Sequence, residues 1–347
     1  MPNLVHQRPS AVEQARDEIA WLRFLVSREA VQFLARHLPL AQLRDHLPHF
    51  LTERLRLGLY PARVTDPLQV TCARDYPPWG APVELDPYLP VQFAAAQPTV
   101  SILIVTYGNL DLTRLCLASV QRAAGILPFE IIVVDNHSED GTAEYLTAVQ
   151  AQGLLPLRVV LSPHNLGFAA ANNQAARLAR GRYLVLLNND TVVLPGWLES
   201  LTRALAADAH AGIVGPVTNS CGNEAQLGTP YHDLHGMRVF AADYTSAHVG
   251  ERAEPPMLTL FCAALTADLW NTVGGLDEGY GLGLFEDDDL AMAVRATGRK
   301  LVLLRDVFVH HYGGAAFSRL PPRQYLRLFW QNRRYFERKW NTTWQER

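Results

Sequence analysis

The sequence has few cysteines and lacks any long apolar run. Its four cysteines lie far apart and form no C-x-x-C pair, a pattern that speaks against a zinc site and against a secreted fold held by disulfides. No apolar run approaches the roughly 20 residues of a membrane-spanning helix, and no signal-peptide pattern opens the chain. We therefore expect a cytoplasmic protein.

A strong charge of either sign is also missing. The formal net charge of the 347 residues is −3, which gives no general attraction to nucleic acid, so we expect no nucleic-acid partner. Hydrophobic residues make up 48% of the chain and charged residues 19%, values typical of a globular enzyme. The length is sufficient for one large domain and a smaller one.

Three apolar segments predict strands of a parallel sheet. Residues 100–105, 130–134 and 183–187 are mostly apolar, which is typical of strands buried on both faces. They alternate with helical patterns at 112–122, 142–150 and 169–179. This alternation indicates βαβ units, and therefore an α/β fold with a mostly parallel sheet flanked by helices.

Polar residues follow each of these strands. Thr106 and Tyr107 follow the first, Asp135 follows the second, and residues 188–191 (N-N-D-T) follow the third. Because such sheets bind ligands beyond the carboxyl ends of their strands, we expect these side chains to converge on one crevice. A carboxylate flanked by amides and a hydroxyl can hold a divalent cation against phosphate oxygens. The alternative for Asp190 is an Asx turn that only ends the strand.

These strand ends belong to a series of short motifs between about residues 98 and 317. The motifs are I-V-T-Y-G-N (104–109), V-V-D-N-H-S (133–138), N-L-G-F-A-A-A-N-N (165–173), L-L-N-N-D-T (186–191), G-G-L-D-E (274–278), F-E-D-D-D-L (285–290) and V-H-H-Y-G-G (309–314). In their order and spacing they resemble the motifs of family 2 glycosyltransferases, which have the GT-A fold. The resemblance implies an inverting transferase that uses Mn²⁺ or Mg²⁺ and a nucleotide-diphosphate sugar, UDP-, dTDP- or GDP-linked. The acceptor would be a hydroxyl group of a glycan, a lipid-linked glycan or a protein.

The same resemblance assigns residues to the nucleotide. It implies that Asp135 accepts a hydrogen bond from the imide N–H of the base, with Thr106 and Tyr107 lining the same pocket. The alternative for Asp135 is a helix N-cap. Further candidates for nucleotide binding are Asn165, Asn173 and Asn189, of which Asn189 would face the ribose.

Metal ligands are expected from two motifs. The family often has Asp-x-Asp where this chain has Asn188-Asn189-Asp190, so Asp190 is the expected ligand and Asn188 a weak one. His310 corresponds to the histidine of the later motif, with His311 as the alternative. Neighbouring residues on a strand point to opposite faces, so only one of the two histidines can reach the ion. A purely structural histidine is the competing interpretation.

The catalytic base is expected in the acidic run 286–289. The resemblance implies that Asp287 is the base, with Glu286 and Asp289 in support; Asp289 would cap the helix or orient a partner. Crowded carboxylates raise one another's pKa, which suits a base that works near neutrality. A single base without a second carboxylate as nucleophile predicts inversion. The alternative is an acidic first turn that only stabilises a helix.

The remaining segments lie outside these motifs. Residues 1–60 show a helical pattern, which predicts a small helical cap or a homo-oligomerisation element or, alternatively, an acceptor-recognition module. Residues 61–97 are rich in proline and are expected to form an extended connector. The catalytic domain is expected at 98–317. Residues 219–256 show little periodicity and are expected to be irregular and to form part of the acceptor wall. Residues 318–347 predict a basic amphipathic helix, because they carry eight Lys and Arg against two Glu. This helix either packs on the catalytic domain or makes peripheral contact with the inner face of an anionic membrane.

Two other functions fit parts of the pattern. A nucleotidyltransferase shares the sheet and the metal chemistry, but it needs a glycine- and lysine-rich loop after the first strand, and residues 107–111 (Y-G-N-L-D) do not provide one. A non-catalytic nucleotide-sugar binding protein is the other alternative, because the first Asp of the metal motif is replaced. The intact acidic run at 286–289 argues against it.

Overall fold

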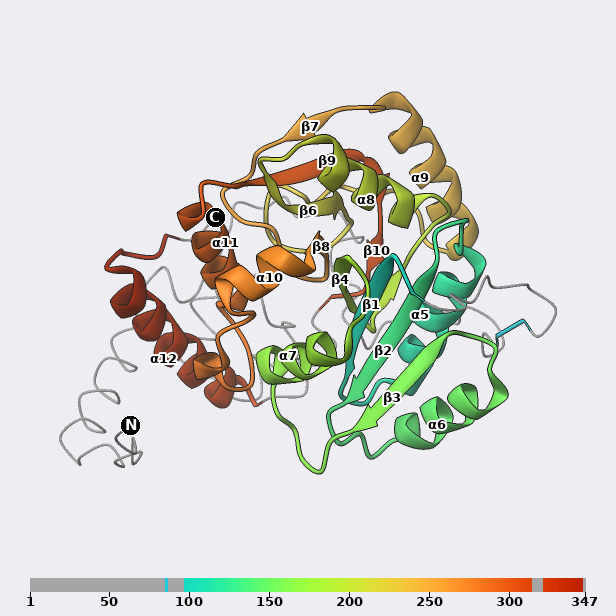
Figure 1. Cartoon of the computed structure of the whole chain (residues 1–347), viewed down its shortest axis with the longest axis horizontal. Helices are drawn as coiled ribbons and strands as arrows, with labels where there is room; N and C mark the ends of the chain where they lie inside the picture. The colour runs from blue at the N-terminus through green and yellow to red at the C-terminus, as the bar shows by residue number, and fades with distance from the viewer. Residues whose placement is uncertain (1–84, 87–96, 314–320, 346–347) are drawn as a thin grey trace, which may run out of the picture. The chain divides into compact units, whose positions relative to one another are not determined.

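The computed structural model in Figure 1 describes residues 85–86, 97–313 and 321–345. The chain divides into two compact units, Met1–Val70 and Thr71–Arg347, and every described residue lies in the second. The predicted helical extension at 1–60 and most of the connector at 61–97 therefore lie outside the described residues.

The described part is built on a mostly parallel sheet with the strand order β3-β2-β1-β4-β8-β6-β9-β7. The pairs β1–β2, β1–β4, β2–β3 and β6–β9 are parallel, whereas β8 and β7 run antiparallel to their neighbours. The α/β fold with a mostly parallel sheet is thus confirmed. The strands are β1 (Val100–Thr106), β2 (Phe129–Asp135), β3 (Leu157–Leu161), β4 (Tyr183–Asn188), β6 (Ala211–Val217), β7 (Arg252–Ala253), β8 (Cys262–Thr266) and β9 (Lys300–Phe308).

Helices cover both faces of this sheet (Figure 1). Ile102 and Ile104 of β1 pack in one hydrophobic core, and Leu103 between them packs in a second core on the opposite face. Helices α6 and α8 contribute to the first core, and α7, α10 and α11 contribute to the second. The helices are α5 (Leu110–Arg122), α6 (Thr142–Gln152), α7 (Phe168–Leu178), α8 (Trp197–Ala207), α9 (Leu234–Ala247), α10 (Ala267–Val273), the 3₁₀ turn η1 (Glu278–Tyr280), α11 (Glu286–Ala296) and α12 (Pro322–Trp340).

The strand register brings the polar strand ends together. Thr106 at the end of β1 is paired with Asp135 at the end of β2, and Val105 is paired with Asn188 at the end of β4. A separate antiparallel pair, β5 (Thr191–Val192) with β10 (His310–His311), lies directly beyond β4 and places His311 opposite Thr191. Residues more than a hundred positions apart in the chain therefore meet at the carboxyl end of β4.

The segment 219–256 is more regular than its sequence indicates. It contains helix α9 and strand β7, so the prediction of an irregular stretch is wrong here. Asp233 caps α9 by accepting a hydrogen bond from the backbone N–H of Gly236 at 2.6 Å. The helix escapes a search for periodicity because only Met237 and Ala241 of its 14 residues are buried.

The C-terminal helix α12 packs on the segment that connects η1 to α11 (Figure 1). Its buried residues Phe329 and Phe336 contact the ring of Phe285 with centroid distances of 5.2 and 5.9 Å. Packing on the domain that contains the sheet is therefore what the structure shows for this helix. Among the helices that the structure describes, none has the length and apolar content needed to cross a membrane.

Candidate active site

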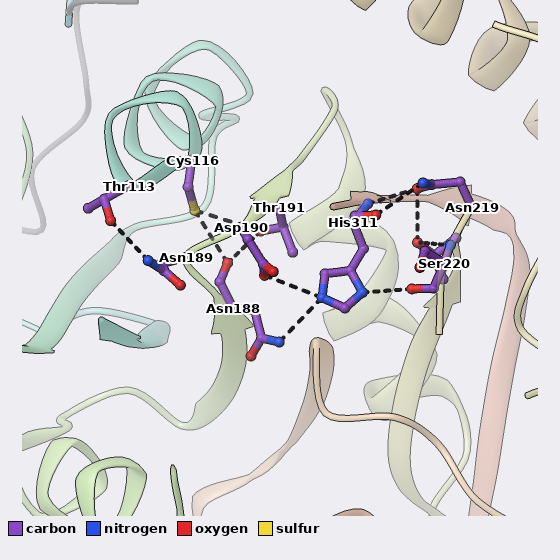
Figure 2. Close-up of polar contacts among 10 residues, drawn as sticks. Thr113, Cys116, Asn188, Asn189, Asp190, Thr191, Asn219, Ser220 and His311 are labelled. Carbon is purple, nitrogen blue, oxygen red and sulfur yellow. Dashed lines mark hydrogen bonds and ion pairs between the residues drawn. The ribbon is translucent and has the colours of Figure 1, made fainter. Parts of the chain in front are cut away.

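Asp190 and His311 form the centre of the candidate site (Figure 2). The Nε2 atom of His311 lies 3.3 Å from Oδ1 of Asp190, and both side chains are buried. The side-chain nitrogen of Asn188 lies 3.5 Å from the same Nε2 atom. The three residues come from the end of β4, the turn that follows it and β10, so the site depends on the β5–β10 pairing.

The imidazole ring of His311 is held in one orientation. Its Nδ1 atom lies 2.7 Å from the carbonyl oxygen of Ser220, and because a carbonyl can only accept, Nδ1 carries the proton of this hydrogen bond. Asn219 binds the backbone N–H and C=O of His311 at 2.8 and 3.0 Å, and the ring of Phe261 stacks on the imidazole at 4.9 Å. The Nε2 atom is thereby directed at Asp190 (Figure 2).

Burial alone would lower the pKa of His311, but the charges and hydrogen bonds around it have the larger effect. The carboxylate of Asp190, the Ser220 carbonyl and the charge of Asp287 together raise the pKa of His311 above its ordinary value. The histidine is therefore electrostatically coupled to both carboxylates.

His310 lies on the other side of β10. Its Nδ1 atom is 2.6 Å from the hydroxyl group of Tyr231, and its ring meets that of Tyr312 edge-on at 4.6 Å. Burial and the neighbouring His311 lower the pKa of His310 to about 3. Neighbouring residues of a strand face opposite ways. The structure therefore places His311, the alternative metal ligand, beside Asp190, whereas His310, the ligand expected first, points into a cluster of aromatic side chains.

The turn that carries Asp190 is fixed by hydrogen bonds of the residues on either side of it. Thr191 donates a hydrogen bond to the Asn188 carbonyl at 2.7 Å, and the side-chain nitrogen of Asn189 donates to Thr113 at 3.0 Å. Figure 2 shows Asn189 directed toward α5 rather than toward Asp190. The hydrogen bonds of Asn189 and Thr191 thus fix the turn that presents Asp190.

Asp135 is buried at the end of β2 and is already hydrogen-bonded. Its carboxylate accepts from the Thr106 hydroxyl at 2.7 Å, from the Ser138 backbone N–H at 3.0 Å and from the Ser138 hydroxyl. The N-cap of α6 is Gly141, so Asp135 closes a turn instead of capping the helix. A carboxylate offers about four acceptor positions, which leaves room for one more donor. Tyr107 next to it is 40% exposed.

Asn165 and Asn173 make structural contacts. Asn165 accepts a hydrogen bond from the backbone N–H of Gly167 at 2.9 Å. Both polar atoms of the Asn173 amide bind the backbone of Leu276, at 2.8 and 2.9 Å, and its nitrogen also binds Glu278 at 2.9 Å. These two residues hold the loops around α7, and the structure does not bring their side chains together with Asp190.

The acidic run opens α11, and its carboxylates have different surroundings. Asp289 is buried and accepts hydrogen bonds from Tyr280, Lys339 and Trp340 at 2.9, 2.8 and 2.7 Å. The N-cap position of α11 is Phe285, without a side-chain cap. The helix cap expected for Asp289 is therefore wrong, and its side chain instead binds residues of η1 and α12.

Asp287 and Glu286 both have raised pKa values. Burial, followed by the charge of Asp288, raises the pKa of Asp287 to about 7, although a backbone hydrogen bond at Leu260 and the charge of His311 act in the opposite direction. Burial and the charge of Asp287 raise the pKa of Glu286 to about 8. The interaction with His311 connects the acidic run to the Asp190 site.

Asn219 and Ser220 are the site residues that sequence reasoning missed. They hold His311 through its backbone and its ring, yet they lie in the segment without periodicity and belong to no motif. A metal-binding histidine usually has a hydrogen-bond partner that orients its ring, and only this rule could have suggested that such a partner exists. Nothing in the sequence indicates that the partner of His311 is Ser220, 91 positions away.

Comparisons with known proteins show what this chain is similar to. The family model described as glycosyl transferase family 2 matches residues 101–260. An uncharacterised protein of Sinorhizobium fredii is 27% identical over 275 residues, 75% of this chain and 30% of that protein. The O-antigen biosynthesis protein RfbC of Myxococcus xanthus is 26% identical over 260 residues, 68% of this chain and 19% of that protein.

The chain thus spans less than a third of the length of either relative.

A solved structure of GalNAc-T7 with UDP, GalNAc and Mn²⁺ matches this chain with a TM-score of 0.48 and 16% identity, over 62% of this chain and 44% of that one. The family match includes Asp135 and Asp190, whereas His311 and Asp287 lie beyond its end. Residues 101–260 of this chain, a little under half of its length, are thus similar to glycosyl transferase family 2.

Proposed function

We propose that this chain is a metal-dependent, inverting glycosyltransferase that moves a sugar from a nucleotide diphosphate to an acceptor hydroxyl group. The observation that carries the proposal is the Asp190–His311 pair at the carboxyl end of β4, with the ring of His311 fixed by Ser220. The family 2 domain supports it independently.

The Asp190–His311 pair fits a divalent cation. Two neighbouring ligands of an octahedral ion with bonds of about 2.1 Å are about 3 Å apart, close to the 3.3 Å observed. The hydrogen bond from Nδ1 to a carbonyl is the usual support of a ligating histidine. A carboxylate with an imidazole favours Mn²⁺ over Mg²⁺.

Two protein ligands leave the remaining positions to other groups. The described part of the chain contains no cluster of three or more His, Cys, Asp or Glu placed to hold a metal ion. We therefore propose that Asp190 and His311 would hold the ion together with the diphosphate of the donor, so that the ion and the nucleotide sugar would bind together. A cation held there would supply the positive charge that stabilises the leaving diphosphate.

Asp287 acts as the base in this proposal. It takes the proton of the acceptor hydroxyl while the acceptor oxygen forms a bond to the anomeric carbon of the sugar. The bond from that carbon to the diphosphate oxygen breaks, and its electron pair leaves with the nucleoside diphosphate. A single displacement of this kind inverts the anomeric centre. A pKa raised to about 7 by burial suits a base near neutral pH.

The nucleotide lies at the ends of β1 and β2 in this proposal. Asp135 is 2% exposed and retains acceptor capacity beside Thr106 and Tyr107, which suits the imide N–H of a base. The acceptor we propose is a hydroxyl group of a glycan, a lipid-linked glycan or a protein.

A screen of nucleotide sugars tests the proposal. The unfolding temperature should rise in the presence of one nucleotide sugar with Mn²⁺, and rise less with either component alone, because a ligand that binds only the folded state stabilises it. Release of the nucleoside diphosphate and the anomeric configuration of the product, read by NMR, then test transfer and inversion. If no UDP-, dTDP- or GDP-sugar shifts the transition or is turned over, the proposal fails.

A further inference from the structure

A left-handed turn precedes the helix that carries Asp287. Leu284 and Phe285, the two residues before α11, have φ values of 78° and 79°. Residues with a side chain rarely adopt this conformation, because the Cβ atom crowds the backbone. Two such residues in a row persist only where their surroundings hold them.

Asn332 of α12 supplies such a hold. Its side-chain nitrogen donates hydrogen bonds to the carbonyl oxygens of Tyr280, Gly283 and Leu284, at 2.8, 2.7 and 3.2 Å. The amide is 2% exposed, and because all three partners can only accept, the nitrogen must be the atom that faces them. One buried amide therefore binds the backbone on the N-terminal side of the turn and at the turn itself.

Aromatic packing holds the second residue of the turn. The ring of Phe285 lies between Phe329, Phe336 and Trp344, with centroid distances of 5.2, 5.9 and 5.3 Å. Farther along α12, Lys339 pairs with Asp289 of α11 at 2.8 Å. The C-terminal helix thus contacts the turn and the first part of α11. Among the described residues, none of its hydrogen bonds or ion pairs reaches Asp287, so its influence on that residue passes through the backbone.

We propose that Asn332 is a positioning residue that fixes the start of α11 and thereby the place of the Asp287 carboxylate. The inference rests on the role of Asp287 in the proposed function. If the turn relaxed to negative φ, the backbone that leads into α11 would take another direction. Asp287 follows the turn by only two residues, so its carboxylate would move away from His311 and from the acceptor hydroxyl group.

Replacement of Asn332 by alanine tests this role. Asn332→Ala should lower kcat by about 10- to 100-fold, the effect of a misplacement near 1 Å, while the Kd of the donor with Mn²⁺ stays unchanged. Gln331→Ala is the matched control, because Gln331 is the exposed neighbour on the same helix. Hydrogen exchange of the amides at 284–290 should become faster in Asn332→Ala and remain slow in Gln331→Ala.

A second variant separates positioning from plain loss of stability. Asparagine tolerates the left-handed conformation better than leucine, so in a Leu284→Asn background the turn should depend less on Asn332. The loss of kcat caused by Asn332→Ala should therefore be several-fold smaller in that background. If the single variant Asn332→Ala does not fold, the double variant Leu284→Asn/Asn332→Ala should fold, because the turn then depends less on Asn332; a double variant that also fails to fold overturns the inference.

The outcomes distinguish the inference from the function on which it rests. If Asp287→Asn turns over as fast as the wild type, the proposed role of Asp287 fails, whatever Asn332 does. If Asp287→Asn is inactive but Asn332→Ala keeps wild-type kcat and slow exchange at 284–290, the positioning role is overturned. An equal loss of kcat from Asn332→Ala in the wild-type and Leu284→Asn backgrounds also overturns it.

Discussion

The Nε2 atom of His311 lies 3.3 Å from Oδ1 of Asp190. A charge-assisted hydrogen bond between a histidinium and a carboxylate is usually 2.7 to 2.9 Å long, about half an ångström shorter. Because Nδ1 already donates to Ser220, a neutral His311 presents the lone pair of Nε2 to the carboxylate. In the proposed function these two groups share a cation; without a cation, the carboxylate of Asp190 raises the pKa of His311 and so favours a proton on Nε2.

Asp190→Ala should abolish donor binding that depends on Mn²⁺, because the only carboxylate of the pair is removed. We expect a cooperative unfolding transition like that of the wild type, since Asp190 lies at the end of β4 and contributes little to either core. Calorimetric titration of the donor with and without Mn²⁺ measures the effect. Asp243→Ala, which removes an exposed carboxylate on α9, is the control, and an unchanged donor affinity in Asp190→Ala would contradict the assignment.

The two neighbouring histidines should respond differently to replacement. His311→Ala should weaken Mn²⁺-dependent donor binding by about 10- to 100-fold, a loss typical of an altered metal environment. His310→Ala should instead lower the free energy of unfolding by about 1 kcal/mol, because the hydroxyl of the half-buried Tyr231 loses its hydrogen bond to His310. Titration calorimetry and urea unfolding of both variants separate the effects. A His310→Ala protein that is fully stable but no longer binds the metal-dependent donor would reverse the choice.

The outward face of α12 carries a row of arginines. The row consists of four exposed residues, Arg323, Arg327, Arg334 and Arg338. At 100° per residue these four side chains lie within an arc of about 60° around the helix axis, opposite the buried Phe329 and Phe336. We expect binding to anionic liposomes at low salt, weakened by salt and by replacement of the four with glutamine, since exposed charges are screened. Neutral liposomes are the control. If the wild type does not sediment with anionic liposomes at low salt, the membrane role is contradicted and packing on the sheet domain is what remains for this helix.

The central strands and their polar ends could be predicted from the sequence alone. Strands buried on both faces leave a continuous apolar signal, as at 183–187, and the position of Asp190 just after such a strand fixes its place at the sheet edge. The pairing of Thr106 with Asp135 follows from the same parallel arrangement. These features are local, or they follow from a rule that holds for every sheet of this kind.

The side-chain partners of the site could not be predicted, because they depend on register and on distant segments. The choice between His310 and His311 depends on which face of β10 meets β5, and a shift of one residue would exchange the two. Ser220 lies 91 positions from His311. Asn332 is a polar residue on the apolar side of α12, and its role becomes visible only when the left-handed turn at Leu284 and Phe285 is known.

Asp287→Asn should lower kcat by about 10²- to 10⁴-fold, the contribution of a positioned base, and should leave the donor Kd unchanged, because a base acts on the chemical step. Burial raises the pKa of Asp287 to about 7. A base works only when deprotonated, so kcat of the wild type should rise with pH through about 7 and level off above it. The residual rate of Asp287→Asn should lack this rise.

Two neighbouring carboxylates serve as controls for this last experiment. Glu286→Gln should reduce kcat less than Asp287→Asn, and Asp289→Asn should act mainly through stability, because Asp289 binds Lys339 and Trp340 of α12. Rates measured at saturating donor from pH 5.5 to 8.5, a range of about 1.5 units on either side of the expected pKa, distinguish the three. If Glu286→Gln or Asp289→Asn is inactive with the donor still bound while Asp287→Asn retains its rate and its pH dependence, the proton is taken by that other carboxylate.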